Sequence, residues 1–136
     1  MAKSFTIRIV TPFGLYKEFK ASMINFRTTD GNRGLLADHM PYVAILPISS
    51  LTTIDSEGKR EIYAVGDGMI HFKNNFCKVL VDVIESEDEI DANRALAAKE
   101  RALKRINHAS EQTDLQRAEL ALKKAMNRIA IIEKSR

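Results

Sequence analysis

The glycines and prolines of this chain are confined to its first half. All six Gly and three Pro lie at or before Gly68, and the following 68 residues contain neither. Residues 91–136 are rich in Ala, Leu, Lys, Arg and Glu, which favour helices, whereas the first 85 residues form short β-branched and aromatic runs separated by turn residues. The sequence therefore predicts a β-rich body followed by a long helical tail.

The body alternates apolar and polar residues with a period of two. Phe5, Ile7 and Ile9, for example, share one face of a first predicted strand. Turn sequences such as residues 11–14 and 55–58 recur roughly every ten residues, and no helical segment separates the runs. This rhythm predicts an all-β sandwich or a flattened barrel.

The tail predicts two helices separated by the polar stretch 108–112. Residues 86–89 (SEDE) have the form of a capping box, which starts a first helix at about residue 89 and runs it to about 107. Residues 113–116 (TDLQ) form a second capping box, which opens a helix to about residue 134. The expected arrangement is an antiparallel hairpin.

A heptad pattern indicates which residues join the two helices. In the second helix the predicted seam consists of Leu115, Ala118, Leu122, Ala125, Ile129 and Ile132. The first helix offers a weaker counterpart in Ala92, Leu96, Leu103 and Ile106. Because each helix alone is only marginally stable in water, packing along this seam decides whether the hairpin forms.

The positive charge of the chain lies on the tail. The net charge is +3, and residues 88–136 hold 11 Lys and Arg against 8 Asp and Glu, whereas residues 1–87 hold 10 of each. Two helical stripes carry much of it: Asp91, Arg94, Arg101 and Arg105 on the first helix, and Arg117, Lys124 and Arg128 on the second. The stripes either converge on a phosphate-bearing ligand or are solvated flanks paired with Glu100, Glu111 and Glu119.

Other chemistry has little support in the sequence. The single cysteine, Cys77, lies in an apolar run and is expected to be a small buried hydrophobe in a reducing compartment. The three histidines lack ligand spacing, so no metal site is expected. Residues 66–68 (GDG) lie between two strands and predict a hairpin turn instead of a phosphate loop. No apolar run is long enough for a membrane span, and no signal peptide is recognisable.

Short motifs across the chain resemble one known family. Residues 90–95 (IDANRA) match the Ile/Leu-Asp-x-x-Arg-Ala motif of the epsilon subunit of bacterial F-type ATP synthases, in particular its bacillus-like members. Residues 98–102 and 117–128 are similar to the C-terminal helices of that family. The body resembles it through residues 10–12 (VTP), 34–36 (GLL) with His39 and Pro41, and 65–68 (VGDG).

The resemblance implies an α+β fold, in which a ten-stranded β-sandwich is followed by an antiparallel two-helix hairpin. It implies that residues 1–86 bind the rotor, through the gamma subunit and the c ring, in a region that includes the loop 31–39. Residues 87–136 would be a regulatory hairpin that either folds down or extends into the alpha/beta catalytic hexamer and blocks ATP hydrolysis. The chain would have no catalytic site and would lie peripherally at the cytoplasmic face of the bacterial plasma membrane.

The resemblance also implies a regulatory ATP site, with Mg²⁺ participation left open. Ile90, Asp91 and Ala95 would lie near the adenine, and Glu85 at the same end. The phosphates would meet four cations: Arg94, Arg101, Lys124 and Arg128. Lys124 stands where the ATP-binding members carry Arg, which replaces a bidentate phosphate contact by a point charge.

Two functions from other classes remain as alternatives. A basic helical hairpin could bind nucleic acid, but the tail contains no Phe, Tyr or Trp on which bases could stack. A small hydrolase on a β-sandwich has no catalytic constellation to support it.

Overall fold

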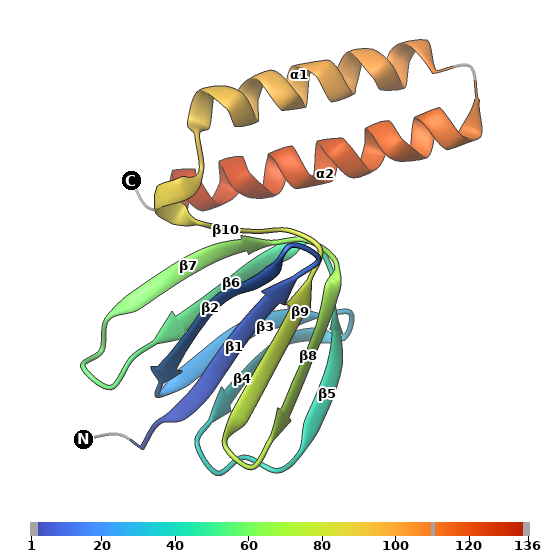
Figure 1. The fold of residues 1–136 in the computed structure, drawn as a ribbon. Helices are drawn as coiled ribbons and strands as arrows, with labels where there is room; N and C mark the ends of the chain where they lie inside the picture. Colours follow the sequence, from blue (N-terminus) through green and yellow to red (C-terminus); the bar gives the residue numbers. More distant parts are fainter. Residues whose placement is uncertain (1–2, 110, 135–136) are drawn as a thin grey trace. The chain divides into compact units, whose positions relative to one another are not determined.

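The computed structural model describes residues 3–109 and 111–134, which form two compact units divided after Ser86 (Figure 1). Within these described residues the first unit holds ten strands. They are β1 (Phe5–Thr11), β2 (Gly14–Ala21), β3 (Met23–Thr28), β4 (Gly31–Leu36), β5 (Tyr42–Leu46), β6 (Ser49–Ile54), β7 (Arg60–Val65), β8 (Gly68–Lys73), β9 (Phe76–Val81) and β10 (Ile84–Ser86).

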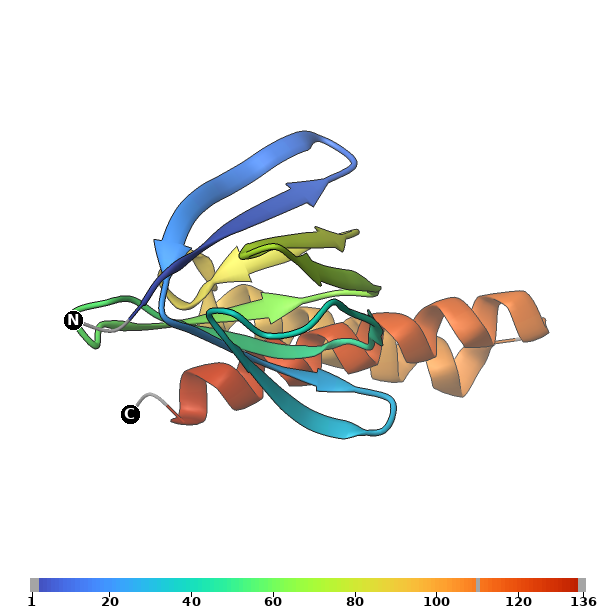
Figure 2. The ribbon, with the colours of Figure 1, turned by 90° about the horizontal axis from the view of Figure 1, so that it is seen from below.

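The strands form two sheets that lie as separate layers in Figures 1 and 2. Sheet A has the strand order β2-β1-β9-β8-β5, and sheet B the order β10-β7-β6-β3-β4. β1 and β9 pair in parallel, whereas the other neighbouring strands run antiparallel. The predicted β-sandwich is therefore confirmed.

The core between the sheets consists of large apolar side chains from alternating strand positions. Phe5, Ile7 and Ile9 are fully buried, as the alternation predicts. The rings of Phe5 and Phe72 meet edge to face at 5.3 Å between centroids, which joins strands distant in sequence. Cys77 is also buried in this core, and burial raises the pKa of its thiol to about 12. Its predicted role as a small hydrophobe is confirmed.

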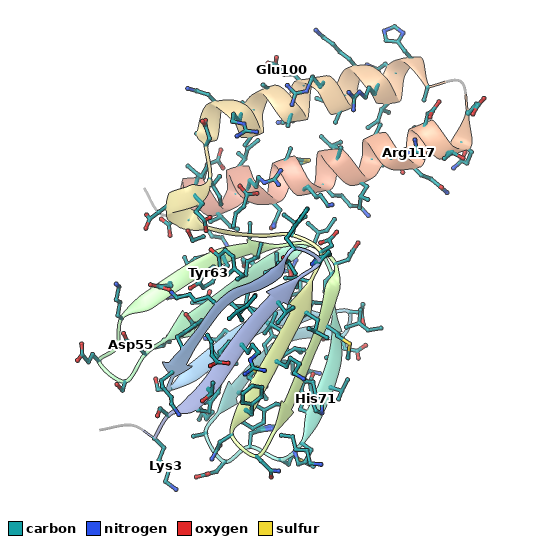
Figure 3. The ribbon with its side chains drawn as sticks, in the orientation of Figure 1. Lys3, Asp55, Tyr63, His71, Glu100 and Arg117 are labelled. Carbon is teal, nitrogen blue, oxygen red and sulfur yellow. The ribbon has the colours of Figure 1, made fainter. Side chains whose placement is uncertain are left out.

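A polar cluster ties β2 of sheet A to β7 of sheet B. Lys17 Nζ lies 3.0 Å from Glu61 Oε2 and 3.3 Å from the hydroxyl of Tyr63, which also donates to Glu61. These hydrogen bonds, led by the one from Tyr63, hold the pKa of Glu61 below its ordinary value. Tyr63, labelled in Figure 3, thus has a buried ring and a satisfied hydroxyl.

The prediction of a hairpin turn at residues 66–68 is wrong. β7 belongs to sheet B and β8 to sheet A, so this segment crosses from one sheet to the other. A Cβ atom on Gly68 would overlap the Leu80 carbonyl oxygen, and one on Gly66 would overlap the carboxylate of Asp82. The glycines are needed for close approach of backbone and side chains at the crossing.

The second unit is an antiparallel pair of helices, α1 (Ala92–His108) and α2 (Gln112–Lys134), preceded by a 3-10 turn, η1 (Glu87–Glu89). This confirms the predicted hairpin. The N-cap of α1 is Asp91, whose Oδ1 accepts the Arg94 N–H at 3.1 Å. The predicted start of this helix at about residue 89 is therefore wrong, and residues 87–89 form the 3-10 turn instead. Thr113 lies inside α2 instead of capping it. The predicted break at 108–112 includes Ser110, which is outside the described residues.

The hairpin seam differs from its prediction on the first helix. Leu96 and Leu103 are 49% and 41% exposed, whereas the alanines that precede them are buried. Along the two helices the buried alanines are Ala95 and Ala102 on α1, and Ala118 and Ala125 on α2. Counted along the chain, Ala102 and Ala118 are equally far from the connection, and so are Ala95 and Ala125. On α2 the predicted seam holds better, since Ala118 and Ala125 are buried and Leu115, Leu122, Ile129 and Ile132 are half-buried.

Candidate functional site

The seam places basic residues of both helices on one side of the hairpin. A cation immediately precedes each buried seam alanine. Because the helices face each other and run in opposite directions, the residue before a seam position projects to the same side in both. We call this the cationic side of the hairpin; its members are Arg94, Arg101, Arg117 and Lys124. Figure 3 labels Arg117 on α2.

Four of the residues expected to meet ATP phosphates are thus on or beside one surface. Arg94 and Arg101 are exposed, and Lys124 and Arg128 are half-buried. Arg128 follows Lys124 by one helical turn, near the end of the hairpin at which α1 begins. Guanidinium and ammonium groups bind phosphate oxygens, and Lys124 and Arg128 also interact with other groups of the described chain.

The remaining predicted site residues have more varied positions. Ile90 is half-buried ahead of α1, and Asp91 caps that helix. Ala95 is buried in the seam, so its side chain packs between the helices. Glu85 lies on β10 of the sandwich, where it is half-buried and paired in register with Ala64.

A second candidate surface lies on the outer face of sheet A, and the sequence analysis missed it. Register places one apolar residue from each strand in a continuous line: Leu15, Val10, Leu80, Met69 and Ile45. We call this the apolar row. Ile45 is 69% exposed at the edge strand β5, and Phe13 at the nearby β1–β2 turn is 97% exposed. Exposed apolar side chains that adjoin one another across a whole sheet indicate an interaction surface.

The loop that connects β4 to β5 includes part of the predicted rotor-facing segment and is held by hydrogen bonds to Asn75 in the β8–β9 turn. Asp38 has a left-handed backbone, its N–H donates to Asn75 Oδ1 at 2.6 Å, and Asn75 Nδ2 donates back to Asp38 Oδ1 at 2.9 Å. Lys3 adds an ion pair at 2.7 Å, and its hydrogen bond lowers the pKa of Asp38. The ring of His39 packs edge-on against Tyr42 and Phe72. This network presents an exposed Met40 at the tip.

Neither surface has the arrangement of a metal centre. Among residues 3–109 and 111–134 there is no group of three or more His, Cys, Asp or Glu side chains placed to hold a metal ion. Of the two described helices, neither is long and apolar enough to cross a membrane.

Comparison with known proteins decides the family. Residues 4–87 match the family model described as ATP synthase, Delta/Epsilon chain, beta-sandwich domain, and residues 88–133 match its long alpha-helix domain. The ATP synthase epsilon chain of Bacillus velezensis is 37% identical over 129 residues, which cover 95% of this chain and 97% of the relative. The chain belongs to the ATP synthase epsilon chain family. The resemblance noted in the sequence is therefore confirmed.

Further relatives agree with this assignment. The epsilon chain of Lactobacillus helveticus is 38% identical over 135 residues, covering 95% of this chain and 92% of its own length. A chain in the structure of the Euglena gracilis mitochondrial ATP synthase, OSCP/F1/c-ring, has the same fold, with a TM-score of 0.81 at 21% identity over 93% of this chain and 80% of that chain. As an epsilon chain, the protein is a non-catalytic subunit of ATP synthase, and not an enzyme by itself.

Proposed function

We propose that this chain couples and regulates an F-type ATP synthase through two separate modules. The sandwich docks on the gamma subunit and the c ring, and the hairpin restrains ATP hydrolysis when it extends toward the alpha/beta hexamer. The chain acts at the cytoplasmic face of the membrane, as a peripheral subunit. Family membership and the division after Ser86 support this assignment.

The apolar row carries the docking half of the proposal. Its residues come from every strand of sheet A and leave large apolar side chains in water. When a partner covers these side chains, their apolar surface leaves water, and each Å² that is buried stabilises the complex by about 25 cal/mol. We assign the gamma subunit to this row, and the c ring to the hydrogen-bonded loop around His39.

A charge placed in the apolar row tests the docking surface. Met69→Glu would place a carboxylate in the centre of the interface, so we expect gamma binding to weaken by about a hundredfold or more. Ser56→Glu, in the exposed β6–β7 turn of sheet B, adds the same charge elsewhere and should bind normally. Circular dichroism checks that both variants keep the fold. If both variants bind gamma equally well, gamma does not dock on the apolar row.

The cationic side carries the regulatory half. Within the hairpin, ATP would meet Arg94, Arg101, Lys124 and Arg128, with Ile90, Asp91 and Ala95 toward the adenine. A ligand that binds only the folded hairpin stabilises it by about 2.7 kcal/mol at a hundredfold excess over Kd. ATP would therefore favour the folded, non-inhibitory hairpin, and its depletion would allow extension.

Calorimetric titration of the full chain tests the ATP site. Arg94→Ala should weaken binding about tenfold or more, because it removes one cation of the cluster. Lys124→Arg should preserve or tighten binding, since it restores a planar phosphate-binding fork. Lys104→Ala, which removes an exposed lysine two residues beyond the seam, is the control. Titration with EDTA present decides whether Mg²⁺ accompanies ATP. If ATP produces no heat, or if Arg94→Ala binds ATP with unchanged affinity, the cationic side is not an ATP-binding site.

A further inference from the structure

The outer face of sheet A carries a second pattern beside the apolar row. Register defines two further lines of outward side chains across the strands. The first line consists of Glu18, Arg8, Lys78, His71 and, on β5, the exposed Val43. The second consists of Lys20, Thr6, Phe76 and Lys73. Figure 3 labels His71 on β8, which pairs with Val43 of β5.

These two lines are strongly basic. Arg8 pairs with Glu18, and its guanidinium lies over the ring of Phe76 at 5.0 Å from the centroid. Within the described parts of the chain, Lys20, Lys73 and Lys78 form no ion pair. We call the four cations the basic band: Arg8, Lys20, Lys73 and Lys78. They lie on one side of the apolar row only, so the face is asymmetric.

We propose that the basic band selects the docking partner by charge: it receives acidic side chains that border an apolar strip on the partner, and Lys78 is its central contact. The proposal rests on the proposed docking of gamma on sheet A and specifies the chemistry of that contact. Lys78 is the natural centre because it lies between Arg8 and His71 in register and adjoins Leu80 of the apolar row along β9.

The dimensions of the face limit what can occupy it. Neighbouring strands lie about 4.8 Å apart, so the apolar row is roughly 19 Å long. Residues two apart on one strand are separated by about 6.7 Å, which sets the distance from the row to Lys78. An amphipathic helix of about 13 residues spans the row at 1.5 Å per residue. Acidic residues along one flank of its apolar stripe would meet the basic band.

The same features favour a protein over a lipid surface. Leu80 and Met69, in the centre of the row, are 37% and 38% exposed, whereas Leu15 and Ile45 at its ends are 63% and 69% exposed. A membrane-binding surface needs apolar side chains that project several Å below the headgroups, beyond its cations. An apolar row with a half-covered centre, flanked by the half-buried Arg8 and Lys78 and the exposed Lys20 and Lys73, matches the apolar centre and charged margin of a protein interface.

Charge reversal in the full chain tests the proposal. Binding of the purified gamma subunit of the same enzyme is measured at low and at physiological salt for the wild type, Lys78→Glu and Met69→Glu. We expect Lys78→Glu to weaken binding by about tenfold or more at low salt and to reduce the salt dependence. Arg60→Glu, an exposed cation at the start of β7 in sheet B, is the matched control and should leave both quantities unchanged. Thermal unfolding confirms that each variant is folded.

The outcomes separate this proposal from the docking proposal. If Lys78→Glu binds gamma with wild-type affinity and salt dependence while Met69→Glu fails, the apolar row docks gamma and the basic band does not select it. If both variants bind normally, gamma docking on sheet A is itself wrong. Retention of the wild type, but not of Lys78→Glu, on phosphatidylglycerol vesicles, with unchanged gamma binding in the variant, would assign the band to a lipid surface and overturn the proposal.

Discussion

The sandwich and the hairpin differ in what they bury. The largest fully buried side chains of the chain, including Tyr63, Phe5 and Phe72, all lie in the sandwich. The seam of the hairpin buries alanines, while Leu96 and Leu103 remain exposed beside it. Burial of a large apolar side chain stabilises a fold by about 1.5–3 kcal/mol, and a methyl group contributes far less. The sandwich core therefore depends on large apolar side chains, whereas the buried residues of the two helices are four alanines and Ile131.

The largest effect should follow from a cavity in the sandwich core. Phe72→Ala removes a fully buried ring that meets Phe5 edge to face, and should lower the free energy of unfolding by about 3–5 kcal/mol. Denaturant unfolding measures this, with Met40→Ala, at an exposed loop position, as the control. A loss under about 1 kcal/mol would mean that the sandwich core is not tightly packed around Phe72.

A larger residue in the alanine seam should open the hairpin without affecting the sandwich. Ala102→Leu overpacks the close contact and should cost about 1–3 kcal/mol locally. Amide exchange should then lose protection along α1 and α2, with unchanged protection in the strands. Ala97→Leu, on an exposed position of the same helix, is the control. Unchanged exchange of the helices in Ala102→Leu would contradict the alanine seam.

A smaller effect is expected at the start of α1. Asp91→Ala removes the carboxylate that accepts the Arg94 N–H, and should cost about 1 kcal/mol by fraying the first turn. Asp91→Asn keeps an acceptor and should preserve the turn. Amide exchange at Arg94 and Ala95 measures the difference. If Asp91→Asn frays the turn as much as Asp91→Ala does, the charge matters more than the cap.

The smallest effect should be a pH dependence that belongs to the sandwich alone. Hydrogen bonds from Tyr63 and Lys17 lower the pKa of Glu61 in the folded state. The stability that this carboxylate contributes is therefore complete above its unfolded pKa, near 4.5, and is lost as pH falls through the lower folded value. Unfolding measured between neutral and acidic pH should show a shallower decline in Glu61→Gln. If the free energy of unfolding falls with pH equally in the wild type and in Glu61→Gln, the hydrogen bonds from Tyr63 and Lys17 do not stabilise the Glu61 carboxylate.

The same contrast explains what the sequence could predict. The alternation of Phe5, Ile7 and Ile9 predicts a strand with one buried face, because successive side chains of a β-strand point to opposite sides of the sheet. On α1, hydrophobicity favours Leu96 and Leu103 for the seam, but the close approach of two helices selects Ala95 and Ala102 instead. Residue size at an interhelical contact depends on the partner helix, and a single helix pattern does not contain that information.

The docking face illustrates a second limit. β5 reads YVAIL, so apolar residues occupy both of its faces and the outward Ile45 resembles the inward Leu46. The apolar row appears only when register aligns Ile45 with Met69 and Leu80. By contrast, the cationic stripes follow helical spacing within one segment, so the sequence predicted Arg94 and Lys124 as members of them.

Competition between the sandwich and the full chain tests the division of labour most directly. ATP hydrolysis by ATP synthase depleted of its epsilon chain is measured while the full chain is added, alone or after a chain that ends at Ser86. We expect the shortened chain to leave hydrolysis uninhibited and to relieve inhibition by the full chain, because it occupies the docking site and lacks the hairpin. Inhibition by the shortened chain, or its failure to compete, would contradict a sandwich that docks and a hairpin that regulates.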